Sequence, residues 1–318
     1  MIYAKRPEPK KRRKKMNVKE EQWSQDGIDY KDWNNVPEKD IACYDYADYE
    51  EEHYPLSPEA TPAEGVPRGT VTEHDWESHK IYPGVKGKYW LYVPEQYKGQ
   101  EAALMVFLDG GWYVQDKVPE VLDSMIAKKE IPVMIGLFIS PGDRGPGLPR
   151  YGGTDNRSIE YDSIDERYAE FLEKEIISEI KKSYKISNNA GDHGICGISS
   201  SGNAAFAAAW NRNDLFARVL THVGSFTNIR GGYHFPSMIR KGKKRDLRVF
   251  LQTGEHDLNT CFGDWKIANM DMESALKYRD YQVKLVIGPG AHSGRYGISI
   301  LPESLRWLWK SENENGKE

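Results

Sequence analysis

Cysteine is scarce in this sequence, which contains only Cys43, Cys196 and Cys261. The three are odd in number and far apart, whereas a disulfide framework needs pairs and a zinc site needs closely spaced ligands. The sequence therefore predicts neither a disulfide-stapled fold nor a cysteine-bound metal, and we expect no metal site.

Long hydrophobic runs are also missing. None approaches the roughly 20 residues that a membrane-spanning helix requires. The basic cluster KKRRKK (10–15) is not followed by an apolar stretch, so it does not resemble a secretory signal. We expect a cytoplasmic protein without a membrane partner; the same sequence with a leader removed would belong to a secreted or periplasmic protein.

Neither sign of charge dominates, because 44 lysines and arginines stand against 48 acidic residues for a net charge of −4. This balance gives no general attraction to nucleic acid, and none is expected as a partner. The charges are nevertheless segregated: residues 5–19 are basic and residues 20–52 acidic, without apolar periodicity. We predict that residues 1–60 form a charged tail, disordered or loosely packed, that residues 55–67 act as a linker, and that residues 61–318 form one folded domain.

Strand and helix patterns alternate along this domain. Two antiparallel strands are predicted at 69–82 and 87–94. Apolar runs typical of strands in a buried sheet follow at 103–109, 132–139, 193–198, 218–224, 247–254 and 282–288. Helices are predicted at 119–129, 163–184, from 204, at 265–279 and at 301–310. This order predicts an α/β fold with a mostly parallel sheet and helices on both faces.

Three consecutive serines stand where one of these strands meets a helix, in GICGISSSGN (194–203). An α/β-hydrolase holds its nucleophilic serine on such a turn, with small residues two places before and after it. With Ser199 as the nucleophile, Gly197 stands at the tight entry; with Ser200, the β-branched Ile198 would stand there. We therefore predict Ser199 as the nucleophile.

An acid and a histidine follow in the order that this fold uses, Ser, Asp or Glu, then His. Glu255 and Asp257 come after a predicted strand; Asp257 lies further into the loop and is preferred, although Glu255 stays open. His292 lies past the last predicted strand in a glycine-rich loop. It would accept the serine proton, and the acid would fix its tautomer.

A tetrahedral intermediate needs hydrogen-bond donors for its oxyanion. One is expected from the backbone N–H of Ser200, directly after the nucleophile. The second is expected from Gly111 or Trp112 in FLDGGWYV (107–114), where two glycines allow the backbone to turn inward. The Trp112 side chain is also a candidate wall of the substrate pocket.

Several long segments resemble the putative esterase family, which includes enterochelin esterases and related carbohydrate esterases. The resemblance covers about residues 67–310 and depends on MVFLDGGWYV (105–114), NRSIEYDS (156–163), CGISSSGNAAF (196–206), GSFTNIRGG (224–232), VFLQTGEHDLN (249–259), GDW (263–265), GAHSGRYG (290–297) and LPESLRWLW (301–309). It implies an α/β-hydrolase fold, a serine esterase mechanism and no cofactor. It also implies Ser199, Asp257 and His292 as nucleophile, acid and base.

The resemblance further suggests that Arg157 and Glu160 lie near the active site and order the pocket; a structural ion pair is the alternative. The sequence departs from the family at Ser201, where glycine is usual.

The function expected from these residues is a serine carboxylic ester hydrolase of the enterochelin esterase type, acting on a small-molecule ester through an acyl-enzyme. A carbohydrate esterase acting on a feruloyl or acetyl ester of a plant polysaccharide is the alternative. Arg157 and Arg230 would suit an anionic siderophore, and Trp112 and Trp265 an aromatic feruloyl group. A non-catalytic binding protein on a hydrolase scaffold is the alternative of another class.

Overall fold

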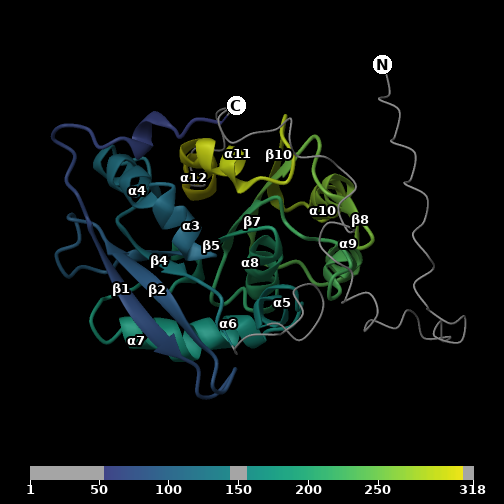
Figure 1. Cartoon of the computed structure of the whole chain (residues 1–318), viewed down its shortest axis with the longest axis horizontal. Coiled ribbons are helices and arrows are strands. Elements are labelled where there is room, and N and C mark those ends of the chain that lie inside the picture. The colour runs from purple at the N-terminus through teal and green to yellow at the C-terminus, as the bar shows by residue number, and fades with distance from the viewer. Residues whose placement is uncertain (1–53, 144–155, 311–318) are drawn as a thin grey trace, which may run out of the picture.

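An eight-stranded sheet organises the molecule (Figure 1). The computed structural model describes residues 54–143 and 156–310. The strand order is β1 (Thr70–Glu77), β2 (Lys86–Val93), β4 (Met134–Ile139), β3 (Ala103–Leu108), β5 (His193–Ile198), β6 (Arg218–His222), β7 (Arg248–Gly254) and β10 (Gln282–Gly288). The pairs β1–β2 and β2–β4 are antiparallel and every other pair is parallel, as the sequence predicts. A small antiparallel pair, β8 (Asn259–Thr260) and β9 (Gly263–Asp264), follows β7.

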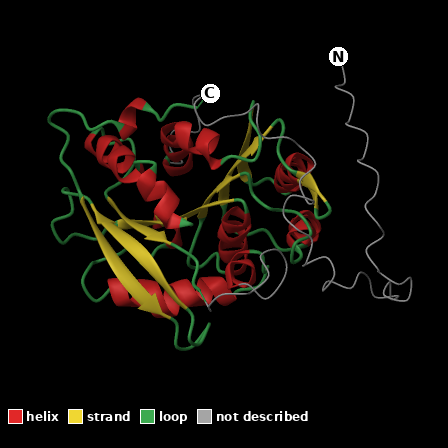
Figure 2. Ribbon diagram, in the orientation of Figure 1, coloured by secondary structure: helices red, strands yellow, loops and turns green. Residues whose placement is uncertain are grey.

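Helices cover both faces of the sheet (Figure 2). The α-helices within the described residues are α3 (Gly110–Gln115), α4 (Val118–Ala127), α5 (Asn156–Tyr161), α6 (Arg167–Phe171), α7 (Ser178–Ile180), α8 (Ser200–Asn211), α9 (Phe235–Lys241), α10 (Trp265–Tyr278), α11 (Gly294–Ser299) and α12 (Leu301–Trp309). A π-helical turn, η4 (Leu172–Ile177), joins α6 to α7, and single 3₁₀ turns lie at η3 (Pro58–Ala60), η5 (Ala190–Asp192) and η6 (Gly232–His234). In this part of the chain, no helix combines the length and apolarity needed to cross a membrane.

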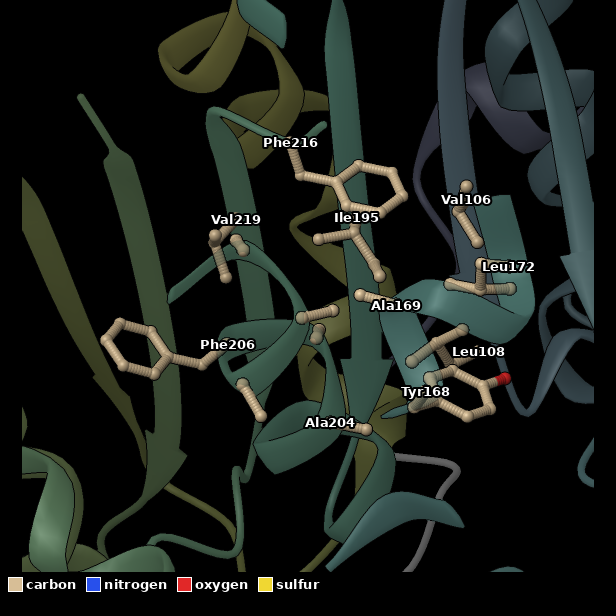
Figure 3. Packing of buried hydrophobic residues seen from close by; sticks show 14 of the residues in the cluster. Val106, Leu108, Tyr168, Ala169, Leu172, Ile195, Ala204, Phe206, Phe216 and Val219 are labelled. Atoms are coloured by element: carbon tan, nitrogen blue, oxygen red, sulfur yellow. The ribbon is translucent and has the colours of Figure 1, made fainter. Parts of the chain in front are cut away.

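Successive side chains of the central strands point to opposite faces of the sheet and so divide the core into two halves. On β3, Leu104, Val106 and Leu108 join one buried cluster, while Met105 and Phe107 join the other. Successive side chains of a strand point to opposite faces, so an all-apolar strand serves both clusters. Figure 3 shows the cluster in which strands β3, β5 and β6 pack against α6 and α8. The apolar runs of the sequence therefore become central strands because each can be buried on both faces.

The helices that differ from the predictions are mostly short. The helix predicted over 163–184 begins at Arg167 and contains the π turn. The sequence patterns did not indicate α3, α5, α9 or α11, which have six or seven residues each. Isolated helices of this length are unstable in water, so tertiary packing rather than local pattern maintains them.

The folded body begins before the end of the segment predicted to be a linker. Tyr54 and Ala60 are both buried, and Ala60 belongs to the apolar cluster beneath α4. Glu59 pairs with Lys128 and Arg306, which attaches the 3₁₀ turn η3 to α4 and α12. Residues 54–60 are thus part of the folded body, which corrects the last part of the tail predicted for residues 1–60; residues 1–53 lie outside the described residues.

Candidate active site

The serine turn joins β5 to α8 through a strained residue. Ser199 has φ 59° and ψ −120°, a backbone conformation that residues other than glycine rarely adopt. A side chain at Gly197 would place its Cβ 2.1 Å from the carbonyl oxygen of Ser201, so the entry to this turn admits only glycine. The backbone of Ser199 is held at both ends, because its N–H donates to the carbonyl of His222 and its own carbonyl accepts from Ser225. The strain is therefore imposed by the surrounding fold.

The three serine hydroxyls of this turn have different partners. Ser199 Oγ lies 2.8 Å from His292 Nε2. Ser200 is buried, and its hydroxyl helps to lower the pKa of the buried Asp162 carboxyl against the larger, opposite effect of burial. Ser201 Oγ bonds both the N–H and the carbonyl of Ile198 at 2.7 Å, so the serine that replaces the usual glycine ties the turn to the end of β5. Of the three, Ser199 is the one whose hydroxyl contacts an imidazole nitrogen.

His292 lies in the loop after β10, and Asp257 contacts the ring nitrogen that faces away from Ser199. Its Nδ1 is 2.6 Å from Asp257 Oδ1, while its Nε2 faces Ser199. Asp257 follows β7, which is parallel to β5 and β10. The carboxyl ends of parallel strands meet at one edge of a sheet, which is why residues 93 positions apart can touch.

The Asp257 carboxylate is buried and fully satisfied. Thr253 Oγ1 donates to its Oδ2 at 2.6 Å, and the N–H of Leu258 donates to its Oδ1 at 2.7 Å. Burial alone would raise the pKa of Asp257, but His292 and these donors outweigh burial and hold the pKa below its usual value. Asp257 is thus an anion beside the imidazole, whereas the alternative acid, Glu255, is exposed and pairs with Lys266.

The backbone N–H groups predicted to bind the oxyanion differ in whether they already have a hydrogen-bond partner. The N–H of Trp112 donates to the carbonyl of Asp109, so this predicted donor is already engaged. The N–H groups of Gly111 and Ser200 have no partner within residues 54–143 and 156–310. Because β3 and β5 are neighbours, these two amides begin adjacent helices at the same edge of the sheet. Of the two alternatives for the second donor, the structure favours Gly111.

Arg157 makes an ion pair, but with Asp109 rather than with Glu160. Its Nε and Nη2 lie 3.2 and 2.7 Å from the two carboxylate oxygens of Asp109, the residue directly before α3. Glu160 is 1% exposed and accepts the N–H of Gly142 at 3.1 Å. Glu160 therefore holds the loop after β4 and offers no surface to a substrate, while Arg157 ties α5 to the start of α3.

The two predicted tryptophans differ in exposure. The side chain of Trp112 is 54% exposed at the beginning of α3. Trp265 is only 3% exposed; its ring stands edge-on to His292, and its Nε1 donates to Ser225 Oγ at 3.0 Å. Trp112 is thus available to a substrate, whereas the buried Trp265 packs against His292.

Sequence reasoning did not single out Ser225, Thr253 or Asp109. Each follows or ends a strand at the same edge as Ser199, which is a signal that strand prediction could have provided. Among the described residues, no cluster of three His, Cys, Asp or Glu side chains is placed to hold a metal ion.

Comparison with known proteins agrees with the fold. The chain aligns over 76–80% of its length with an enterobactin esterase from Shigella flexneri (20% identity, 63% of that chain, TM-score 0.62), a ferulic acid esterase (18%, 98%, 0.60) and the ferulic acid esterase AmCE1/Fae1A from Anaeromyces mucronatus (13%, 94%, 0.63). The chain thus spans under two thirds of the enterobactin esterase. These likenesses confirm the predicted α/β-hydrolase fold.

Sequence comparison gives the family. No curated protein sequence matches the chain significantly. The family model described as "Putative esterase", however, matches residues 82–261, which is more than half of the chain. The match includes the serine turn and the Asp257 loop and ends before His292. The chain therefore belongs to this esterase family.

Proposed function

We propose that the chain cleaves carboxylic esters through a Ser199–His292–Asp257 triad and an acyl-enzyme. The observation that carries this proposal is the line of contacts from Ser199 Oγ through both ring nitrogens of His292 to Asp257. In this arrangement His292 takes the serine proton as the oxygen attacks the ester carbonyl, and then gives it to the leaving alcohol. Water repeats the same steps on the acyl-enzyme and releases the acid.

The oxyanion of each tetrahedral intermediate would be bound by the N–H groups of Ser200 and Gly111. Both amides lack another partner among the described residues, so they can donate without breaking an existing bond. Arg157 supports this site indirectly, since it anchors Asp109 immediately before the turn that presents Gly111. Removing one such donor commonly costs about 10²–10³-fold in kcat.

We propose further that the substrate carries an aromatic group. The exposed Trp112 ring stands next to Gly111 and could stack against it. The candidates are the lactone of a catecholate siderophore and a feruloyl ester of a saccharide. The charge of Arg157 is neutralised by Asp109, which favours the feruloyl ester over an iron-loaded, anionic siderophore.

The test of the triad is hydrolysis of short p-nitrophenyl esters by wild type, Ser199→Ala and Ser200→Ala, each checked for folding by circular dichroism. We expect Ser199→Ala to lose at least about 10³-fold in kcat, because the nucleophile is gone. Ser200→Ala should keep measurable turnover, because it retains the backbone N–H. Loss of turnover in Ser200→Ala alone would identify Ser200, and not Ser199, as the nucleophile.

The substrate class is tested by comparing methyl ferulate with methyl acetate and with a catecholate siderophore lactone. Preferential cleavage of methyl ferulate, lost through a raised KM in Trp112→Ala, supports the feruloyl proposal. Preferential cleavage of the lactone would contradict the feruloyl proposal and support a catecholate siderophore as the substrate.

A further inference from the structure

A second hydroxyl contacts the attacking oxygen. Ser225 Oγ lies 3.2 Å from Ser199 Oγ and accepts a hydrogen bond from Trp265 Nε1 at 3.0 Å. Ser225 is 2% exposed, and its backbone N–H donates to the carbonyl of Ser199. Both its backbone and its side chain are thus fixed to the nucleophile.

Counting the protons along this chain of contacts gives the direction of each bond. Asp257 is an anion, so His292 Nδ1 carries a proton and donates to it, which leaves Nε2 as an acceptor. The single hydroxyl proton of Ser199 is then directed to Nε2. The contact between the two serines must consequently use the proton of Ser225, with Ser199 Oγ as acceptor. An indole N–H can only donate, so Trp265 leaves the Ser225 proton free for this bond.

We propose that Ser225 is a further catalytic residue of this site: it donates a hydrogen bond to Ser199 Oγ, and Trp265 is the positioning residue that orients it. The proposal rests on the proposed triad. The bond from Ser225 holds Ser199 Oγ facing His292 and stabilises the negative charge that develops on this oxygen as its proton leaves. A hydrogen bond to a charged oxygen is stronger than one to a neutral oxygen, so the contact favours the transition state over the resting hydroxyl.

The same loop provides a matched control. Thr227 is also buried, two residues further on, but its hydroxyl has no hydrogen-bond partner among the described residues. Thr227→Val removes a buried hydroxyl from this loop without touching Ser199. It therefore separates a general effect of altering the loop from the loss of the Ser225 bond.

The experiment is stopped-flow acylation by p-nitrophenyl acetate, which yields the acylation rate constant and the substrate dissociation constant separately. We expect Ser225→Ala to lower the acylation rate constant about tenfold with an unchanged dissociation constant, because Ser225 contacts the nucleophile. Ser225→Thr, which keeps the hydroxyl, should recover part of the rate. Trp265→Phe should lower the rate by a smaller factor, and Thr227→Val should acylate like wild type.

An acylation rate constant for Ser225→Ala within twofold of wild type, with Ser199→Ala inactive, would overturn the inference and leave the triad standing. Turnover by Ser199→Ala would overturn both. A loss of rate in Thr227→Val equal to that in Ser225→Ala would also overturn it, since the effect would then belong to the loop. If Ser225→Ala does not fold, Trp265→Phe decides, and a wild-type rate in that variant counts against the inference.

Discussion

His222 lies next to Ser199, the proposed nucleophile. It is the last residue of β6, its carbonyl accepts the N–H of Ser199, and its Nδ1 lies 3.1 Å from the hydroxyl of Tyr113. The side chain is fully buried, and burial lowers the pKa of His222 to about 3. Burial also lowers the pKa of His193. The His222 imidazole is therefore neutral in the folded protein at mildly acidic pH.

This burial predicts a pH dependence of stability. Between about pH 4 and 6 the unfolded chain binds a proton at His222 and the folded chain does not, so acid favours unfolding. The free energy of unfolding should rise with pH in this window by about 1.4 kcal/mol per unit for this residue. The free energy of unfolding, measured with urea at several pH values, should rise less steeply with pH for His222→Gln than for wild type. His79→Gln, at an exposed histidine, is the control and should keep the wild-type slope; an unchanged slope in His222→Gln would contradict the prediction.

At the scale of elements, the ion pair between Arg157 and Asp109 joins α5 to α3. Asp109 has φ 56° and is 7% exposed, so the turn before α3 is strained and its carboxylate is largely removed from water. Nearby, the hydroxyl oxygen of Tyr161 in α5 accepts a hydrogen bond from the N–H of Asp109 at 3.3 Å. Helix α5 thus supports the loop that presents Gly111.

A double-mutant cycle tests this link. We expect Arg157→Gln to destabilise the fold by about 2–4 kcal/mol and to lower kcat, because it leaves Asp109 buried without its charged partner. The double variant with Asp109→Asn should recover part of the stability, giving a coupling energy of about 1–3 kcal/mol. Urea unfolding and steady-state kinetics provide both readouts. A higher KM with unchanged stability and kcat would instead make Arg157 a substrate-binding residue.

At the scale of the whole molecule, the N-terminal segment contacts α11, the helix that directly follows the loop with His292. The Tyr54 ring stands edge-on to Tyr296 at 5.3 Å, and its carbonyl accepts a hydrogen bond from Arg295. Arg295 also pairs with Asp116 at the end of α3. Residues more than 240 positions apart therefore share one cluster close in sequence to His292.

Tyr54→Ala should accordingly affect more than local packing. We expect a loss of about 2–4 kcal/mol of stability, as for other buried aromatic side chains. The cavity left by the missing ring would lie close to the loop that carries His292. For this reason kcat should also fall, by about two- to fivefold. Urea unfolding measures the first effect and ester hydrolysis well below the melting temperature the second. Tyr278→Ala, at an exposed ring on α10, is the matched control and should change neither.

The sequence by itself determined the order of the sheet strands and of the longer helices, the mostly parallel sheet and the residues at the strand ends. These follow from local patterns: apolar runs that can be buried on both faces, and the small residue that a tight turn requires before Ser199. His292 and Asp257 could be predicted in the same way, because parallel strands bring their following loops to one edge.

Only the tertiary structure decided which partner each polar group takes. It paired Arg157 with Asp109, buried Glu160 against Gly142, engaged the N–H of Trp112 and placed Ser225 against Ser199. It also stabilised the short helices α3, α5, α9 and α11, whose sequences are too short to be helical alone. The reason is the same in each case: these contacts join segments that are remote in sequence, and their energies depend on distances and burial that no local pattern encodes.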